Sequence, residues 1–310
     1  MAGRSTQAGT RELFVKRYNS DGSHDVTFGD SQSGSLTLGQ LGKVTFNGLE
    51  HAQGGSGKDV FNLANPSSAN GILSLDGDTG NSLDSVQVAR DANITLTNAK
   101  VTIQAQVAGQ VDQSFTLMHI KTAILNGGNS DNFLNARWFS GSVILNGGEG
   151  NDVLWGGSGN DKLNGGNGHD WISGNAGDDI LIGWNGRDVL IGGDGTDQLN
   201  QSSLRVSDYG DDILIGGKTA YDFNKSAVDS LQLAWLASET FLQRVQHLET
   251  DGVGTGDYKL NTSLVTDDGL TDTYFGGLGI DWYFAQLTAT MPGHETTGAA
   301  GVETQQELHL

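Results

Sequence analysis

The chain has 310 residues, of which 47 are Gly and 2 are Pro, and it contains no Cys. Collagen, which needs abundant Pro and Gly at every third position, is therefore excluded, as are disulfides and thiolate metal sites. The formal net charge of −20, from 37 acidic and 17 basic residues, disfavours nucleic acid and anionic membranes and favours cations. Any metal ion must be held by oxygen or imidazole ligands.

The N-terminal stretch, MAGRSTQAGTRELF, carries basic residues but lacks the apolar core of a secretory signal. We expect residues 1–11 to be disordered. No stretch of the sequence approaches the length of a membrane-spanning helix. The protein therefore stays inside the cell, leaves by a route that needs no cleaved N-terminal signal, or is a piece of a longer protein.

Residues 12–146 contain short segments in which apolar and polar residues alternate as they do in strands: SLTLG, KVTFNGL, GILSL, NITLTN, KVTIQAQ and SFTLMHI. These segments predict an irregular β-solenoid. Two nine-residue units anticipate a stronger repeat further on: GGSGKDVFN at 54–62, with Asp59, and GGNSDNFLN at 127–135. The second unit has Ser130 and Asn132 at the positions that bear possible ligands, so we expect its turn to be metal-free.

An unbroken nonapeptide repeat runs from Gly147 to Asn200. Every unit has Gly at positions one and four, Asp at position six, and Leu or Ile at position eight. The units are GGEGNDVLW, GGSGNDKLN, GGNGHDWIS, GNAGDDILI, GWNGRDVLI and GGDGTDQLN, and SDYGDDILI at 207–215 restores the pattern after an interruption. The Asp residues at position six are Asp152, Asp161, Asp170, Asp179, Asp188 and Asp197, followed by Asp212.

Each unit divides into a glycine-rich turn and a three-residue strand whose central aliphatic residue points inward. Two units complete one coil, so residues two units apart stack at the ordinary strand spacing of about 4.8 Å. The Asp residues then form two columns, one on each edge, in which the carboxylates would repel one another. A hard divalent cation resolves this conflict, and calcium suits six to eight oxygen ligands better than magnesium does. The alternative is a metal-free β-helix in which these Asp residues only cap turns.

The unit resembles the repeat-in-toxin, or haemolysin-type, calcium-binding repeat, GGxGxDxUx with U a large apolar residue. The resemblance implies a parallel β-roll with Ca²⁺ between successive turns on each edge, about four ions or more. It implies that one turn supplies its Asp and the carbonyl oxygens of positions one and three, which are Gly147, Glu149, Gly156, Ser158, Gly165, Asn167, Gly174 and Ala176. The next turn would supply its Asp and the carbonyl oxygens of positions two and four, which are Gly166, Gly168, Asn175, Gly177, Trp184, Gly186, Gly193 and Gly195. Asn175 and Trp184 replace Gly without removing a carbonyl, although we expect Trp184 to distort its turn.

After residue 217 the period stops. Ser226-Ala-Val-Asp229 reads as a capping box, and apolar residues at helical spacing predict one amphipathic helix over about 226–248. The stretch 267–285 returns to the repeat, with Asp272 and Asp281 at the metal-binding position. The predicted fold class is therefore all-β: a calcium-binding parallel β-roll at 147–217, a cap at 218–290 with one C-terminal amphipathic helix, and a disordered tail at 291–310.

The outward strand positions on one sheet form an apolar face that includes Trp155 and Trp171. We expect the predicted helix to cover it, since large apolar patches are normally covered. The alternative is a docking face on which a protein or a glycan stacks against the two indoles.

Position five places His169 and Arg187 in a column beside the calcium row. These side chains and a cation could support hydrolysis, although solvated loop residues are the plainer interpretation. The first functional hypothesis is thus an extracellular calcium-binding module whose folding is driven by Ca²⁺. The alternative is a calcium-dependent hydrolase of an ester, phosphoester or glycan. The resemblance implies secretion without a cleaved N-terminal signal, alone or as part of a larger secreted bacterial protein.

Overall fold

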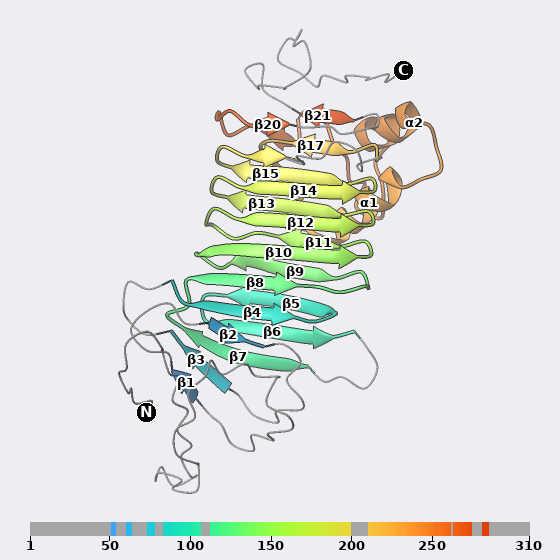
Figure 1. Ribbon diagram of the computed structural model, residues 1–310. Helices are drawn as coiled ribbons and strands as arrows, with labels where there is room; N and C mark the ends of the chain where they lie inside the picture. Colours follow the sequence, from blue (N-terminus) through green and yellow to red (C-terminus); the bar gives the residue numbers. More distant parts are fainter. Residues whose placement is uncertain are drawn as a thin grey trace, which may run out of the picture.

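The fold is described from a computed structural model (Figure 1). The structure describes residues 51–53, 60–63, 73–77, 83–106, 112–199, 210–261, 263–274 and 281–284. Several predictions lie outside these residues: the disordered ends at 1–11 and 291–310, the strands SLTLG and KVTFNGL, and the role of Asp59.

Two sheets make up most of the described chain. The long sheet has 11 strands, in the spatial order β1 (His51–Gln53), β3 (Leu73–Asp76), β7 (Gln113–Met118), β6 (Lys100–Ala105), β5 (Ala92–Thr97), β9 (Phe133–Trp138), β11 (Val153–Trp155), β13 (Trp171–Ala176), β15 (Val189–Asp194), β17 (Ile213–Ile215) and β21 (Trp282–Phe284). The short sheet has 8 strands, in the order β2 (Val60–Asn62), β4 (Ser85–Ala89), β8 (Thr122–Asn126), β10 (Ser142–Glu149), β12 (Lys162–Asn167), β14 (Ile180–Asn185), β16 (Gln198–Leu199) and β20 (Thr273–Tyr274).

From β8 to β17, consecutive strands of the chain alternate between the two sheets, and these strands pair with one another in parallel. Across the repeat, the register joins residues 18 positions apart, as when Leu154 pairs with Ile172 and Leu163 pairs with Leu181. The chain is thus mostly β with parallel sheets, which is consistent with the expected β-roll.

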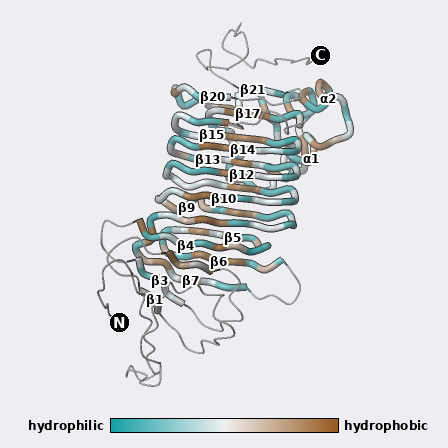
Figure 2. The backbone as a smooth tube through the Cα atoms, viewed as in Figure 1, coloured by the Kyte–Doolittle hydropathy of each residue, from teal (hydrophilic) through white to brown (hydrophobic). Residues whose placement is uncertain are grey.

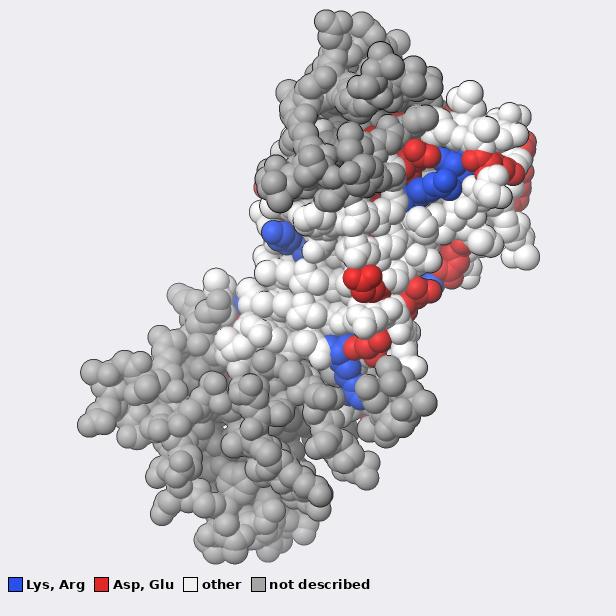
Figure 3. Space-filling view, turned by 45° about the vertical axis from the view of Figure 1, so that its right-hand side comes forward, with Lys and Arg blue, Asp and Glu red and all other residues white. Residues whose placement is uncertain are grey.

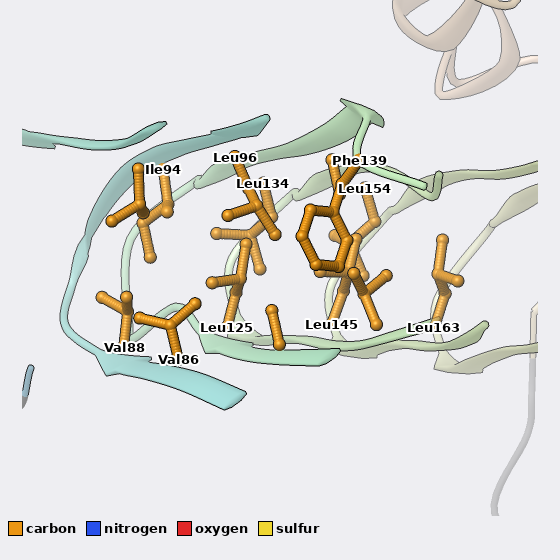
Figure 4. Close-up of a cluster of buried hydrophobic side chains, with 14 of the residues drawn as sticks. Val86, Val88, Ile94, Leu96, Leu125, Leu134, Phe139, Leu145, Leu154 and Leu163 are labelled. Carbon is orange, nitrogen blue, oxygen red and sulfur yellow. The ribbon is translucent and has the colours of Figure 1, made fainter. Parts of the chain in front are cut away.

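The core lies between the two sheets. The residue at position eight of each unit, such as Leu154, Leu163 or Ile172, is 0% exposed, because alternate side chains of a strand point to the same face. Figure 4 shows aliphatic side chains from both sheets meeting in this space, and Figure 2 shows apolar residues along the strands with polar residues at the turns.

The N-terminal part departs from a purely parallel arrangement. Strands β5 and β6 form an antiparallel hairpin, and β6 is also antiparallel to β7. The turn between β5 and β6 is closed by a hydrogen bond from Thr97 Oγ1 to the carbonyl oxygen of Lys100. The segments NITLTN and KVTIQAQ, both predicted as strands, therefore pair with each other rather than forming successive coils.

The single helix predicted over 226–248 is wrong in its boundaries. The structure has α1 (Lys225–Trp235), α2 (Phe241–Gln246) and a π-helical turn, η1 (His247–Asp251). Asn224 rather than Ser226 caps α1, and Thr240 interrupts the helix because it forms a capping box with Gln243 at the start of α2. No helix in the described part of the chain is long and apolar enough to span a membrane.

The helices belong to an excursion of the chain between successive turns. β17 is followed by β18 (Lys218–Thr219), the helices and β19 (Val265–Thr266), which pairs with β18. The chain then returns, and β20 and β21 pair with β16 and β17. We call residues 225–251 the helical segment. Its apolar side packs on the outer face of the long sheet, as the buried cluster of Val228, Leu231, Trp235, Trp171 and Trp282 shows.

Candidate metal centre

Two columns of Asp residues follow the edges where the chain enters the strands. On the first edge, the turns lead into strands of the long sheet, and each Asp accepts a hydrogen bond from the backbone N–H of its counterpart one turn earlier. The donor and acceptor pairs are Asp152 N to Asp170 Oδ1 (2.7 Å), Asp170 N to Asp188 Oδ1 (2.8 Å), Asp188 N to Asp212 Oδ1 (2.8 Å) and Asp212 N to Asp281 Oδ1 (3.0 Å). Asp212 and Asp281 therefore stand in the column where the sequence placed them.

The second edge, whose turns lead into the short sheet, has the same ladder. The pairs are Asp161 N to Asp179 Oδ1 (2.7 Å), Asp179 N to Asp197 Oδ1 (2.8 Å) and Asp197 N to Asp272 Oδ1 (2.9 Å). Asp272, which the repeat put at the metal-binding position, is a member of this column.

The second oxygen of these carboxylates is what a cation would use. Oδ2 of Asp152, Asp170, Asp179 and Asp197 is buried and has no hydrogen-bond partner among the described residues, a costly state for a charged group. Each faces the position-one Gly of its own unit: a Cβ on Gly147 would lie 2.1 Å from Asp152 Oδ2 and 2.6 Å from the carbonyl oxygen of Gly165. Carboxylate and carbonyl oxygens thus converge on space that only Gly leaves open.

Burial of these carboxylates also disfavours their ionised form. It raises the pKa of Asp152 to about 8 and that of Asp179 to about 9, where repulsion from Asp161 contributes as well. Burial raises the pKa of Asp161, Asp170 and Asp197 to about 7. At neutral pH the columns need either protons or a cation, so the residues present fit a metal ion.

The remaining oxygens come from the backbone of the turns. Positions two and four adopt positive φ in five of the units, for example 114° at Gly166 and 136° at Gly168. Asn175 and Trp184 do the same, with φ of 84° and 75°, so the distortion expected at Trp184 is not seen. Among the described residues, no group of three or more His, Asp or Glu side chains could hold a metal by itself. Backbone carbonyls must therefore complete any site.

A comparison with known families agrees with this geometry. The family model of the RTX calcium-binding nonapeptide repeat (4 copies) matches residues 140–172 and 164–199. Residues 140–199 are RTX repeats. Repeats of this family bind calcium. No curated protein matches the chain.

The first column of the RTX repeats ends in a polar cluster that contains no repeat Asp. Asp152 Oδ1 accepts the backbone N–H of Asn132 (2.6 Å). The amide of Asn132 fills the space next to Gly127, accepts the N–H of Gly128 at 2.7 Å and donates to Asp91 Oδ1 at 3.1 Å. Sequence reasoning missed Asp91, since a β-hairpin separates it from Asn132 and no repeat marks it. The amide supplies the hydrogen-bond donor to Asp91 here.

His169 and Arg187, the speculative catalytic pair, do lie together on the first edge. His169 Nδ1 accepts the backbone N–H of Arg187 at 2.8 Å, and the carbonyl oxygen of His169 accepts a hydrogen bond from Gln232 Nε2 in α1. Burial and the nearby Arg187 lower the pKa of His169. These contacts join both residues to the helical segment.

The helical segment covers the face of Trp155 and Trp171, as expected, so the alternative of an open docking face does not hold in this structure. Trp155 is 3% exposed and Trp171 is 0% exposed, because the helical segment and its flanking residues cover them. Phe223 meets Trp155 edge-on, with ring centroids 5.6 Å apart. Neither indole is open to a glycan or a partner protein.

Proposed function

We propose that this chain is an extracellular calcium-binding module whose folding is driven by Ca²⁺ held between stacked turns of a parallel β-roll. One observation carries this proposal. In the two Asp columns of the RTX repeats, four buried carboxylate oxygens have no hydrogen-bond partner among the described residues. We assign the roll to residues 147–217, an irregular β-solenoid to 12–146 and the cap to 218–290.

The ligands follow from pairs of turns one coil apart. Gly147, Glu149 and Asp152 would face Gly166, Gly168 and Asp170, with carbonyl oxygens from the glycines and Glu149. The same pattern continues along both columns, so the consecutive Asp pairs within 147–200 give two sites on each edge, about four in all. Trp184 and Asn175 contribute through their carbonyl groups, which their positive φ angles place as Gly would.

Folding should depend on the cation because the chain alone cannot satisfy these columns. Without it, the ionised Asp columns repel, and glycine-rich turns lose much entropy when they become ordered. A bound Ca²⁺ supplies positive charge and accepts six to eight oxygen ligands. Metal-binding free energy then becomes folding free energy.

An extracellular location suits this mechanism. Extracellular calcium modules have dissociation constants of about 10⁻⁴–10⁻³ M, so their sites fill where calcium is millimolar. The resemblance of the repeats to those of secreted bacterial proteins supports the same location.

A calcium titration tests the proposal. Far-UV circular dichroism of the full chain, started in chelator, should show strand signal appearing as free Ca²⁺ rises through about 10⁻⁴–10⁻³ M. The control is Mg²⁺ at equal concentration, which should produce little strand signal because it keeps its water ligands. A strand signal that is the same in chelator and in calcium would contradict the proposal.

A further inference from the structure

The residue at position five, directly before each Asp of the first column, contacts the helical segment in three successive turns. The carbonyl oxygen of His169 accepts a hydrogen bond from Gln232 of α1. Arg187 Nη1 donates to the carbonyl oxygen of Ala237 at 3.4 Å, between α1 and α2. Asp211, before Asp212, binds both helices. The helical segment is therefore fastened to the same backbone that presents the metal ligands.

The contact at Asp211 is the strongest of the three. Arg244 of α2 is only 2% exposed and forms an ion pair with Asp211 Oδ2. Trp235 Nε1 donates to the carbonyl oxygen of Asp211 at 2.9 Å, and the Arg244 guanidinium carbon lies 4.7 Å from the centre of the Trp235 ring. Arg244 also donates to the carbonyl oxygen of Glu239 at 2.8 Å. Figure 3 shows basic and acidic side chains next to each other on the side of the molecule that bears the helices.

Asp211 is joined through the backbone to a residue of the metal column. The next residue, Asp212, accepts the backbone N–H of Asp188 through its carboxylate and donates its own N–H to Asp281. A change in the position of Asp212 must therefore move the carboxylate and carbonyl that hold Arg244 and Trp235.

On the first edge, position-five residues also bond to one another, as when His169 N donates to Asn151 Oδ1 at 2.8 Å. The second edge has the same ladder: Asp178 N donates to Asn160 Oδ1 at 3.2 Å, and Thr196 N donates to Asp178 Oδ1 at 3.0 Å. In the described part of the chain, the hydrogen bonds and ion pairs of these side chains do not reach α1 or α2. The two edges thus have equivalent Asp columns but different neighbours.

We propose that calcium binding on the first edge, and not on the second, is coupled to docking of the helical segment over the long sheet through His169, Arg187 and Asp211. The inference rests on the proposed calcium function. Coupling of this kind is reciprocal. A change that weakens the docking of the helical segment must weaken the binding of calcium on the first edge, and loss of calcium there must weaken the docking. When the helical segment is released, the face formed by Trp155, Trp171 and their neighbours is uncovered.

A matched pair of variants tests one direction. Asp188→Asn removes a first-edge carboxylate and Asp179→Asn removes one on the second edge, and both residues are at most 1% exposed. Hydrogen–deuterium exchange of the α1 and α2 amides is measured in the full chain at saturating calcium. We expect exchange about fivefold faster or more in Asp188→Asn and within about twofold of wild type in Asp179→Asn. Equal effects of the two variants on these amides would overturn the inference.

The reverse direction uses the helical segment. Arg244→Gln and the milder Asp211→Asn should each raise the calcium concentration at the midpoint of folding by about fivefold or more. Leu242→Gln is the control, because Leu242 lies in α2 but is 72% exposed. An unchanged midpoint in Asp211→Asn would refute the coupling.

The two proposals fail differently. If calcium leaves the wild-type strand signal unchanged, the proposed function fails. If wild type folds with calcium and the Asp211 and Arg244 variants match it, only the coupling fails.

Discussion

Protons and calcium should compete for the Asp columns, so that acidification stabilises the calcium-free fold and weakens the binding of calcium. The perturbation is acidification from pH 8 to pH 5, carried out once in chelator and once in calcium. Burial raises the pKa of Asp179 to about 9 and that of Asp152 to about 8 in the folded, calcium-free chain. An unfolded Asp has a pKa near 3.9. The folded state therefore binds these protons more tightly than the unfolded state does.

The sign and size of the pH effect on the stability of the calcium-free fold follow from the linkage between proton binding and folding. A pKa that is raised on folding gives stability that is fully present below about pH 4 and is lost as the pH rises through the folded value. Burial raises the pKa of Asp170 to about 7, and each pKa unit corresponds to 1.36 kcal/mol. Each such carboxylate thus costs the calcium-free fold on the order of 4 kcal/mol at pH 8. Two of them cancel most of a typical domain stability of about 5–15 kcal/mol.

The assay is far-UV circular dichroism together with calcium binding by calorimetry. In chelator, strand signal should increase as the pH falls from 8 to 5, because protons neutralise the columns. In calcium, the fold is already formed at pH 8, and calcium affinity should decrease with falling pH as binding displaces protons. Asp179→Asn, a mimic of the protonated residue, should stabilise the calcium-free chain at pH 8. Strand signal that is lost in chelator on acidification, or calcium affinity that is equal at pH 8 and pH 6, would refute the reasoning.

Three further predictions concern the turns and the core. Trp184→Gly should raise the free energy of unfolding in calcium by about 1–3 kcal/mol, because a non-Gly residue has a φ of 75° at this position. Thermal unfolding of the variant beside wild type measures this gain, and a lower melting temperature of the variant would contradict the prediction. Gly168→Ala should prevent ordering of the first edge even in calcium, because the added Cβ would lie 1.9 Å from the carbonyl oxygen of Gly150. Calorimetry should show fewer calcium sites than in wild type, and a wild-type stoichiometry would count against this prediction. Leu181 lies between the sheets and is 0% exposed. Leu181→Ala should therefore lower the free energy of unfolding, measured by chemical denaturation, by about 2–5 kcal/mol. A loss below about 0.5 kcal/mol would argue against this core.

The repeat itself could be predicted from sequence because each position has one physical task. Position six bears the carboxylate, position eight fills the core and positions one, two and four need close approach or positive φ, so the period alone fixes the 18-residue register. Asp212 and Asp281 lie in the first column although they are 24 and 69 residues from their partners Asp188 and Asp212. Their local motif, rather than their spacing, marked them.

Features that depend on long-range contacts could not be predicted in this way. Asp91 reaches Asn132 over 41 residues only because a β-hairpin intervenes. The break between α1 and α2 depends on Thr240, whose side chain competes for the backbone at a point where apolar spacing alone continues the helix. The local periodicity of the sequence predicts neither the contact of Asp91 with Asn132 nor the cap at Thr240.

Position five shows why variable positions of a repeat can carry the distinctive function. Asp at position six is identical in all six units because every turn meets the same ligand requirement. Position five is free to vary, since its side chain lies beside the ligands rather than among them. Its backbone nevertheless moves with the neighbouring Asp, so any contact made there senses the metal. On the first edge, His169, Arg187 and Asp211 fasten the helical segment at this position. In the described part of the chain, the position-five side chains of the second edge bond within their own ladder and do not reach the helices. Two chemically equivalent calcium columns can thereby acquire different roles, one that orders the coil and one that also governs what covers it.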